Sequence, residues 1–320
     1  MNSIERVRKT FRFQNPDRVP MVHFNRDRDQ GDLIMIDIQN HHMGPEGLVS
    51  EWGFQWDRLD ATMGQPQDCL IHDWEEDLPS LRAPALDPEN RLAWVKEQAA
   101  KARPDQYLLG SLQLSGFTIM TFLRGFADLM ADFYDEPEAV EQLADIIFGF
   151  EERLIDFAAQ AGLHGVAFFD DWGTQESLLI SPALWRSFFK PRYKAQFDRA
   201  HALGLDVYFH CCGKIDPIID DFFEIGVDML NLSQPNLYDM EALGRKYGGK
   251  RCFVIPVSYQ TTSISGTRQD IFGDVETAVH CLGSQGGGLV GYVEEYSSMG
   301  MSEENYQSCV DAFRELGVYK

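Results

Sequence analysis

A histidine and a cysteine two positions apart are the residues of this chain best suited to chemistry. The sequence His210-Cys211-Cys212-Gly213 directly follows the apolar run 207–209. On an extended segment, residues two apart project from the same face, so His210 and Cys212 lie together while Cys211 points away. Imidazole nitrogen and thiolate sulfur are ligands that zinc accepts. The pattern predicts a metal-binding pair, and the alternative is a buried histidine beside inert thiols.

A catalytic zinc uses three protein ligands and keeps one position open, so a third ligand must come from elsewhere in the chain. Glu294 and Glu295 come directly after the last apolar run, 289–293. A carboxylate can complete a catalytic zinc site. We expect Glu295 to be the third ligand, with Glu294 as the alternative.

Acidic residues also end the apolar run 166–169, which is followed by Asp170-Asp171-Trp172-Gly173-Thr174-Gln175. Adjacent carboxylates in a cleft tend to differ in proton affinity, which suits them to acid or base work. We expect Asp170 to continue the strand alternation, to face inward and, with Gln175, to orient the substrate or manage a proton. Asp171 is expected to contact the substrate. The alternative for both aspartates is a capping or loop role.

Three further side chains on or beside the apolar runs are expected to bind substrate: His23, Asn231 and Tyr292. His41, His42 and His72 lie in an N-terminal excursion, where lone histidines are more often structural than functional.

These candidates need a scaffold that brings the ends of several strands together. Apolar runs rich in β-branched residues recur at 19–24, 107–110, 166–169, 207–209, 229–232, 253–257 and 289–293, and a weaker eighth candidate lies within 32–56. Amphipathic patterns predict helices between them, notably at 137–161, 182–203, 215–225 and 240–247. Continuous apolar strands alternating with helices indicate a parallel sheet buried on both faces.

We therefore predict an α/β fold in which residues 1–320 form a single (β/α)8 TIM barrel, with an N-terminal extension and a long loop excursion at 64–90 that covers one end. A glycine fingerprint of the Rossmann type does not follow the first strand, which argues against dinucleotide binding. Barrel enzymes place catalytic groups at the C-terminal ends of their strands, where the polar residues above are found.

The composition narrows the class of partner. The 320 residues are 44% hydrophobic and 24% charged, with a formal net charge of −22. Such an acidic chain repels nucleic-acid backbones and anionic membranes. The sequence shows no apolar run long enough for a membrane span, and its N-terminus lacks the apolar core of a signal peptide. Six sparse cysteines fit reduced thiols or metal ligands, so we expect a cytoplasmic protein.

Several ordered motifs give the chain a family resemblance. They are Asn15-Pro16-Asp17-Arg18-Val19-Pro20, Leu123-Arg124-Gly125-Phe126, Asp170 to Gln175 leading into Ile180-Ser181-Pro182, Phe189-Lys190-Pro191-Arg192-Tyr193, Phe209 to Lys214, Glu224 to Asp228 with Asn231, and Glu304-Asn305. With these motifs the sequence resembles the uroporphyrinogen decarboxylase superfamily. It is more similar to the methyltransferase branch, which includes corrinoid-dependent methyltransferases and O-demethylase components.

The resemblance implies a (β/α)8 barrel in which His210 and Cys212 are zinc ligands. A cysteine near the end of the last strand often supplies the third ligand in this branch, and this chain has Glu295 at or beside that position. The implied activity is methyl transfer between a small methylated substrate, such as a methyl ether, and a corrinoid (cobalamin) carried on a partner protein. A homo-oligomer is an open alternative.

The true decarboxylases differ at the N-terminus, where an arginine-rich segment binds the carboxylates of the porphyrinogen. This chain has Arg26 and Arg28 there, but they alternate with the acidic residues Asp27 and Asp29. A substrate with many carboxylates, such as a porphyrinogen, needs cationic side chains in its binding site to pair with them. A decarboxylase-like carbon–carbon lyase, in which Asp170 or Asp171 stabilises a protonated intermediate, is therefore the second hypothesis. A non-catalytic protein that binds a metal or tetrapyrrole is the third.

Overall fold

Eight parallel strands form a closed barrel in the computed structural model, which describes residues 1–44, 46–58 and 64–319. The strands are β1 (Met21–His23), β2 (Leu33–Asp37), β5 (Tyr107–Leu114), β6 (Gly165–Phe169), β7 (Asp206–Cys211), β8 (Met229–Leu232), β9 (Cys252–Pro256) and β10 (Leu289–Val293). The barrel closes because β1 pairs with β10 on one side and with β2 on the other. The predicted (β/α)8 fold is confirmed, and β2 is the strand that the sequence indicated only weakly.

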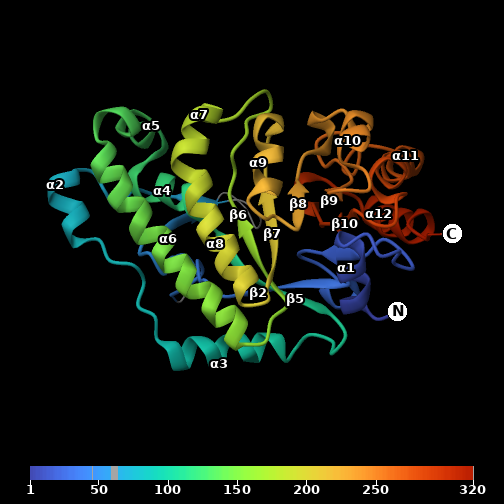
Figure 1. The fold of residues 1–320 in the computed structure, drawn as a ribbon, viewed down its shortest axis with the longest axis horizontal. Coiled ribbons are helices and arrows are strands. Elements are labelled where there is room, and N and C mark those ends of the chain that lie inside the picture. Colours follow the sequence, from blue (N-terminus) through green and yellow to red (C-terminus); the bar gives the residue numbers. More distant parts are fainter. Residues whose placement is uncertain (45, 59–63, 320) are drawn as a thin grey trace.

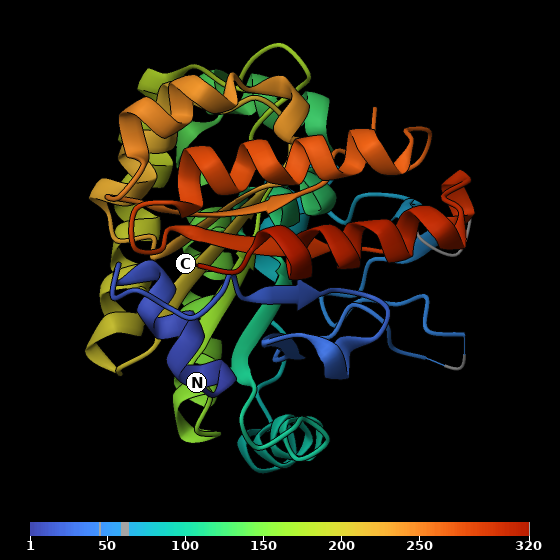
Figure 2. The same cartoon turned by 90° about the vertical axis from the view of Figure 1, so that its right-hand side faces the viewer.

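Helices surround the barrel and return the chain to the start of each next strand (Figure 1). They are α1 (Ser3–Phe11), α2 (Trp74–Asp77), α3 (Pro88–Ala99), α4 (Gly116–Arg124), α5 (Phe126–Asp135), α6 (Pro137–Gln160), α7 (Pro182–Leu184), α8 (Lys190–Ala202), α9 (Ile219–Glu224), α10 (Met240–Tyr247), α11 (Arg268–Ala278) and α12 (Glu303–Leu316). The helix predicted at 182–203 is interrupted, because a π-helical turn, Trp185–Phe189, joins α7 to α8. Figure 2 shows α11 and α12 side by side along one flank of the barrel.

Two hydrophobic clusters separate the inside of the barrel from its outer layer. The inner cluster takes alternate residues of each strand, such as Met35 on β2 and Tyr208 on β7. The residues between them, such as Val207 and Phe209, pack outward against the helices. This alternation fixes which polar residues at the strand ends face the mouth of the barrel.

The N-terminal extension closes the opposite end of the barrel. Helix α1 contacts β2, β5 and β10, and its Val7 is fully buried in the inner cluster. The Arg6 guanidinium lies 2.7 Å from the Asp32 carboxylate, which precedes β2. The extension therefore seals the amino-terminal end and leaves the mouth at the carboxyl ends of the strands.

The predicted excursion begins earlier than expected, directly after β2, and ends where α3 starts. It contains the hairpin of β3 (Trp56–Arg58) and β4 (Gly64–Pro66) and the short helix α2. Residues 59–63 fall outside the described part of the chain. The excursion packs on α4: the Leu70 and Ile71 amides both donate to the Leu123 carbonyl, at 2.9 and 2.8 Å. Within the described residues, no helix is long and apolar enough to cross a membrane.

Candidate metal centre

The His210 and Cys212 side chains meet at the mouth of the barrel. Tyr208 of the same strand lies in the inner cluster, so His210 and Cys212, two and four positions further on, share its face. Cys212 Sγ lies 3.5 Å from His210 Nε2. Cys211 faces the outer layer, where its sulfur accepts a hydrogen bond from the Trp172 amide. The orientation of all three side chains agrees with the alternation expected from the sequence.

The His210 ring is held by an amide whose own orientation is fixed. Asn231 on β8 is 1% exposed, and its Nδ2 donates to the Val254 carbonyl at 2.8 Å. Its Oδ1 therefore accepts, and it lies 2.6 Å from His210 Nδ1. The proton must then reside on Nδ1, which leaves the Nε2 lone pair directed toward Cys212. Metal-bound histidines are oriented in this way by a hydrogen bond to the other ring nitrogen.

Asp171 supplies a third potential ligand. Its Oδ1 lies 3.7 Å from His210 Nε2 and accepts a hydrogen bond from the Cys212 amide at 2.9 Å. One ligand atom from each of Asp171, His210 and Cys212 lies within 4.8 Å of the others. Ligands of a tetrahedral zinc are about 3.3–3.6 Å apart, given bond lengths near 2.0 and 2.3 Å. The nitrogen, sulfur and oxygen donors therefore fit a zinc ion with little movement.

Two glycines bring the Asp171 and Cys212 loops together. Gly213 has φ +77°, and a Cβ on it would lie 2.0 Å from the Gly173 carbonyl oxygen. A Cβ on Gly173 would likewise lie 2.4 Å from the Lys214 amide nitrogen. Only residues without a side chain allow this approach. The glycines that follow the two polar motifs thus determine the distance between the Asp171 carboxylate and the His210–Cys212 pair.

The surroundings of the Cys212 thiol favour its protonated form when no cation is near. Burial raises the pKa of Cys212, and the negative charges of Asp171 and Glu294 raise it further. A bound divalent cation reverses this balance because it stabilises the thiolate directly. The same carboxylates that oppose a free thiolate would then help to neutralise the ion.

Glu294 and Glu295 differ in their partners. Glu294 follows the alternation of the inward-facing Tyr292, and its Oε2 accepts hydrogen bonds from the hydroxyls of Tyr292 and Tyr296, at 2.9 and 2.8 Å. Burial raises the pKa of Glu294, and the nearby His210 opposes that shift. Glu295 instead accepts a hydrogen bond from the Ser297 amide at 2.6 Å. Neither carboxylate belongs to the group of close ligand atoms among the described residues.

Asp170 points away from the mouth, contrary to the expected inward orientation. Ala167 and Phe169 are the inward residues of β6, so Asp170 shares the outer face with Phe168. Its carboxylate accepts hydrogen bonds from the Phe117 and Thr118 amides at the start of α4, both at 2.8 Å, and from the Tyr193 hydroxyl. Burial raises the pKa of Asp170 to about 7. These contacts are those of a helix cap supplied by a neighbouring strand.

The other expected substrate residues are spread over the mouth and the helix layer. Tyr292 lies in the inner cluster and stacks on Phe24 at 5.7 Å. Gln175 is exposed on the loop after β6 and accepts a hydrogen bond from Gln260 at 3.1 Å. His23 is 2% exposed and lies between β1 and α12, with its Nδ1 3.4 Å from the Tyr306 hydroxyl. Of these three side chains, Tyr292 is the one that contacts Glu294, the carboxylate that interacts with His210 and Cys212.

Asp37 is a further polar residue at the mouth, and it is not among the residues predicted from the sequence. It ends β2 on the same face as Met35 of the inner cluster, and burial raises its pKa while Gln113 opposes the shift. Gln113 has φ +54°, at a register shift near the end of β5. Bulges and left-handed non-glycine residues are concentrated at functional sites. A polar residue directly after the apolar run Leu33-Ile34-Met35-Ile36 was the available signal.

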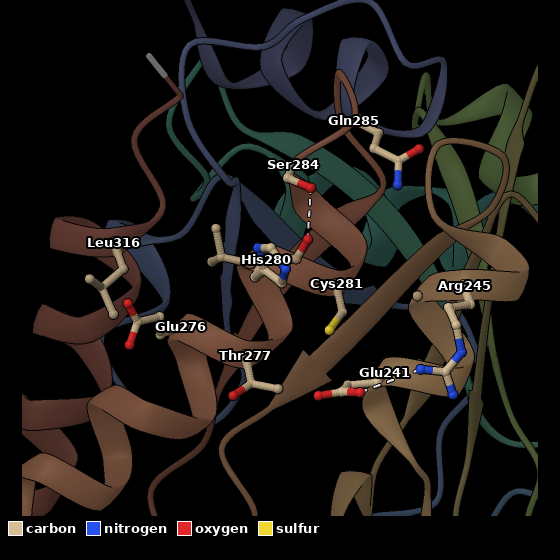
Figure 3. A pocket seen from close by; sticks show the side chains of 11 residues that line it. Glu241, Arg245, Glu276, Thr277, His280, Cys281, Ser284, Gln285 and Leu316 are labelled. Carbon is tan, nitrogen blue, oxygen red and sulfur yellow. Dashed lines mark hydrogen bonds and ion pairs between the residues drawn. The ribbon is translucent and has the colours of Figure 1, made fainter.

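A cavity of about 940 Å³ lies elsewhere, on the outside of the barrel (Figure 3). It is bounded by α10, α11 and the π-helical turn Val279–Gly283. Ser284 donates to the His280 carbonyl at 2.7 Å, and Arg245 pairs with Glu241 at 3.4 Å. Two of its polar side chains thus have partners within the lining, and none of the expected site residues lines it.

Comparison with known proteins identifies the family. The sequence model of the uroporphyrinogen decarboxylase (URO-D) family matches residues 71–293, which include the His210 and Cys212 motif. The chain belongs to the uroporphyrinogen decarboxylase family. This confirms the resemblance seen in the sequence motifs.

A solved structure extends the comparison over the whole barrel of this family member. A methyltransferase from Methanosarcina mazei is 16% identical, with a TM-score of 0.74, and the match covers 98% of this chain and 99% of that one. D-psicose 3-epimerase from Clostridium cellulolyticum H10 is 11% identical with a TM-score of 0.42, covering 72% and 83% of the two chains. A search of curated protein sequences finds no match. The methyltransferase therefore shares the fold of this uroporphyrinogen decarboxylase family member.

The two arginines after β1, Arg26 and Arg28, form hydrogen bonds within this family member. Arg26 forms two hydrogen bonds with the Glu303 carboxylate, at 2.7 and 2.8 Å. Arg28 donates to the Met35 carbonyl. Neither guanidinium is presented as a free cation for the carboxylates of a porphyrinogen.

Proposed function

We propose that this protein is a zinc-dependent methyltransferase that moves a methyl group between a small methylated substrate, such as a methyl ether, and a corrinoid carried by a partner protein. The observation that carries the proposal is the group formed by Cys212 Sγ, His210 Nε2 and Asp171 Oδ1 at the mouth. The fold shared with a methyltransferase supports it.

The ligand set that we propose is His210, Cys212 and Asp171. Asp171 takes the place first expected for Glu295, because its Oδ1 lies 3.7 Å from His210 Nε2 and within 4.8 Å of the Cys212 sulfur. Glu294 is the next candidate, since its charge acts on both His210 and Cys212. Bound zinc would supply a Lewis acid that stabilises negative charge on the heteroatom of the substrate.

The protein's own residues would prepare this site before substrate arrives. Asn231 keeps the proton of His210 on Nδ1, so that Nε2 stays available as a ligand. Tyr292 and Tyr296 hold the Glu294 carboxylate at a fixed place beside the pair. A carboxylate fixed in this way can orient a polar group of the substrate without losing conformational entropy of its own when the substrate binds.

Aromatic side chains provide an apolar surface for the methylated part of the substrate. Phe169 stacks on the His210 ring at 4.9 Å and lies 6.1 Å from Phe24, which in turn stacks on Tyr292. Phe24 and Phe169 are both partly exposed at the top of the inner cluster. We infer that the methyl group lies over this surface and that the corrinoid approaches from the open mouth.

We propose a cytoplasmic location, because all six cysteines are free, as is usual in a reducing compartment. The proposed function is tested by metal content and methyl transfer measured together. Purified protein should contain zinc. His210→Ala and Cys212→Ser should lose the zinc bound at the mouth, together with methyl transfer from free methylcobalamin and methyl transfer to free cob(I)alamin. Full activity of a metal-free preparation would overturn the proposal.

A carbon–carbon lyase is the second candidate, and the match to the uroporphyrinogen decarboxylase family favours it. Because Asp170 is occupied with α4, Asp171 and Asp37 are the carboxyl groups at the mouth that would serve such a reaction. The commitment of Arg26 and Arg28 argues against a substrate with many carboxylates. Release of carbon dioxide from uroporphyrinogen that is insensitive to chelators would decide for this candidate.

A further inference from the structure

A second group of metal-binding side chains lies outside the mouth, in the excursion after β2. Cys69 Sγ is 3.6 Å from His72 Nδ1, and the Asp68 carboxylate is 3.7 Å from His72 Nε2. One ligand atom from each of the three residues lies within 4.8 Å of the others. The donors are again sulfur, nitrogen and oxygen, and the Sγ to nitrogen distance is close to the 3.5 Å found at the mouth.

The backbone around this group is held firmly against α4. In addition to the Leu70 and Ile71 amides on the Leu123 carbonyl, Arg124 donates to the carbonyls of Ile71 and His72, at 3.1 and 2.9 Å. The Asp77 carboxylate accepts from the His72 amide at 2.8 Å. The Cys-x-x-His turn is thus fixed at both ends, so little ordering of the chain would accompany metal binding.

The local charge favours a dication. The Asp128 carboxylate lies in the same region as Asp68. A Cβ placed on Gly125 would lie 3.9 Å from Asp128 Oδ2 and 3.9 Å from Cys69 Sγ, so both atoms border this glycine. Arg124 is the nearby cation; its Nε is paired with Asp132 at 2.7 Å, and its Nη1 lies 3.9 Å from Asp128 Oδ2. Asp68, Asp128 and Asp132 thus outnumber the one guanidinium, and the excess negative charge would balance a dication bound to a thiolate and an imidazole.

We propose that Asp68, Cys69 and His72 form a second binding site for a divalent transition-metal ion, with zinc as the ion best suited to the donor set. His72 binds through Nδ1, the nitrogen that faces Cys69, and Asp68, which lies beside Nε2 in the structure, turns toward the ion. The ion lies beside the α4–α5 turn at Gly125 and apart from the proposed centre at the mouth. Its site is open to solvent, since Asp68 and His72 are both exposed, so the ion exchanges readily.

The test measures cobalt(II) binding to the full-length protein in a Cys212→Ser background, which removes the thiolate at the mouth. The thiolate-to-cobalt charge-transfer band in the near ultraviolet should persist in that background and disappear when Cys69→Ser is added. His72→Ala should weaken cobalt binding at least about 10-fold. Glu75→Gln, an exposed change on the adjacent helix α2, should leave the band and the affinity unchanged.

Zinc stoichiometry by equilibrium dialysis separates this inference from the proposed function. The wild-type chain should bind two zinc ions, and Cys69→Ser and Cys212→Ser should each bind one. If Cys69→Ser, folded by circular dichroism, binds as much zinc as the wild type, the second site is refuted whatever happens at the mouth. If Cys212→Ser alone loses nothing, the proposed function fails and the second site stands.

Discussion

Asn231 Oδ1 lies 2.6 Å from His210 Nδ1, and this contact determines which nitrogen of the histidine is free to bind an ion. The Asn231 amide cannot turn over without losing its hydrogen bond to the Val254 carbonyl. The tautomer of His210 is therefore set by a neighbouring strand of the barrel and not by the ligand itself.

Substitution of Asn231 by alanine should weaken zinc binding about 10-fold to 100-fold, because the ring of His210 loses its orientation while every ligand remains. Competition with a chromophoric chelator measures the affinity. Asn236→Ala is the matched control, since Asn236 lies after the same strand but bonds to Gln260. Equal affinities of the Asn231→Ala variant and the wild type would show that the contact has no bearing on the metal.

The identity of the third ligand is decided by three carboxylate variants. Asp171→Asn should lower zinc affinity most, because Asp171 groups with His210 and Cys212. Glu294→Gln should lower it less, because Glu294 interacts with both residues only electrostatically, and Glu295→Gln should lower it least. Isothermal titration of the metal-free variants gives the order. A larger loss in Glu295→Gln than in Asp171→Asn would restore the ligand expected from the sequence.

The close approach of Gly213 and Gly173 predicts a large effect of a single methyl group. Gly213→Ala should destabilise the fold by more than ~2 kcal/mol and reduce zinc binding, because the added Cβ pushes the two loops apart. Gly204→Ala is a close control: Gly204 has the same φ of +77° but no atom within 4 Å of the added Cβ. Gly204→Ala should cost only the ~1 kcal/mol of the left-handed backbone. Denaturant unfolding of both variants gives the comparison, and equal losses would mean that the loop contact contributes nothing.

Glu151 predicts how stability depends on pH. It is fully buried beside Gly116 and Gln196, and burial raises its pKa from 4.5 to about 8. The folded chain therefore binds this proton more tightly than the unfolded chain does. The contribution of this proton to the free energy of unfolding is fully present below pH 4.5, and it is lost as the pH rises through about 8.

The variant Glu151→Gln should flatten this dependence, since its amide stays neutral. The wild type should lose more than ~1 kcal/mol of unfolding free energy between pH 5.5 and 8.5 relative to Glu151→Gln. Urea unfolding at the two pH values gives the difference. Glu138→Gln, an exposed change on the same helix, should follow the wild type. A Glu151→Gln variant with the slope of the wild type would contradict the burial argument.

The sequence predicted the barrel and the common orientation of His210 and Cys212, because both depend on short-range patterns. Alternation alone separated His210 and Cys212 from Cys211. The face of Asp170 was not predictable in the same way, because Phe168 and Phe169 are both apolar and the strand is buried on both sides. A pattern with no polar contrast cannot show which residues point inward.

The position of Asp171, the proposed third ligand, depends on contacts between loops that are far apart in the sequence. Asp171 approaches Cys212 only because Gly173 and Gly213 pack backbone to backbone, across about forty residues of chain. Strand β2 was hard to recognise because the excursion that follows it breaks the regular spacing of strand and helix. Asp37, which ends that strand, was missed for the same reason.

The central claim is that His210 and Cys212 hold one metal ion together. Zinc K-edge X-ray absorption of the Cys69→Ser protein, loaded with one equivalent of zinc, tests it most directly, because only the mouth then offers a thiolate in the proposed scheme. The claim predicts one sulfur at about 2.3 Å and nitrogen or oxygen ligands at about 2.0 Å, with the outer-shell scattering of an imidazole. A first shell of oxygen and nitrogen alone, with no sulfur, would contradict it.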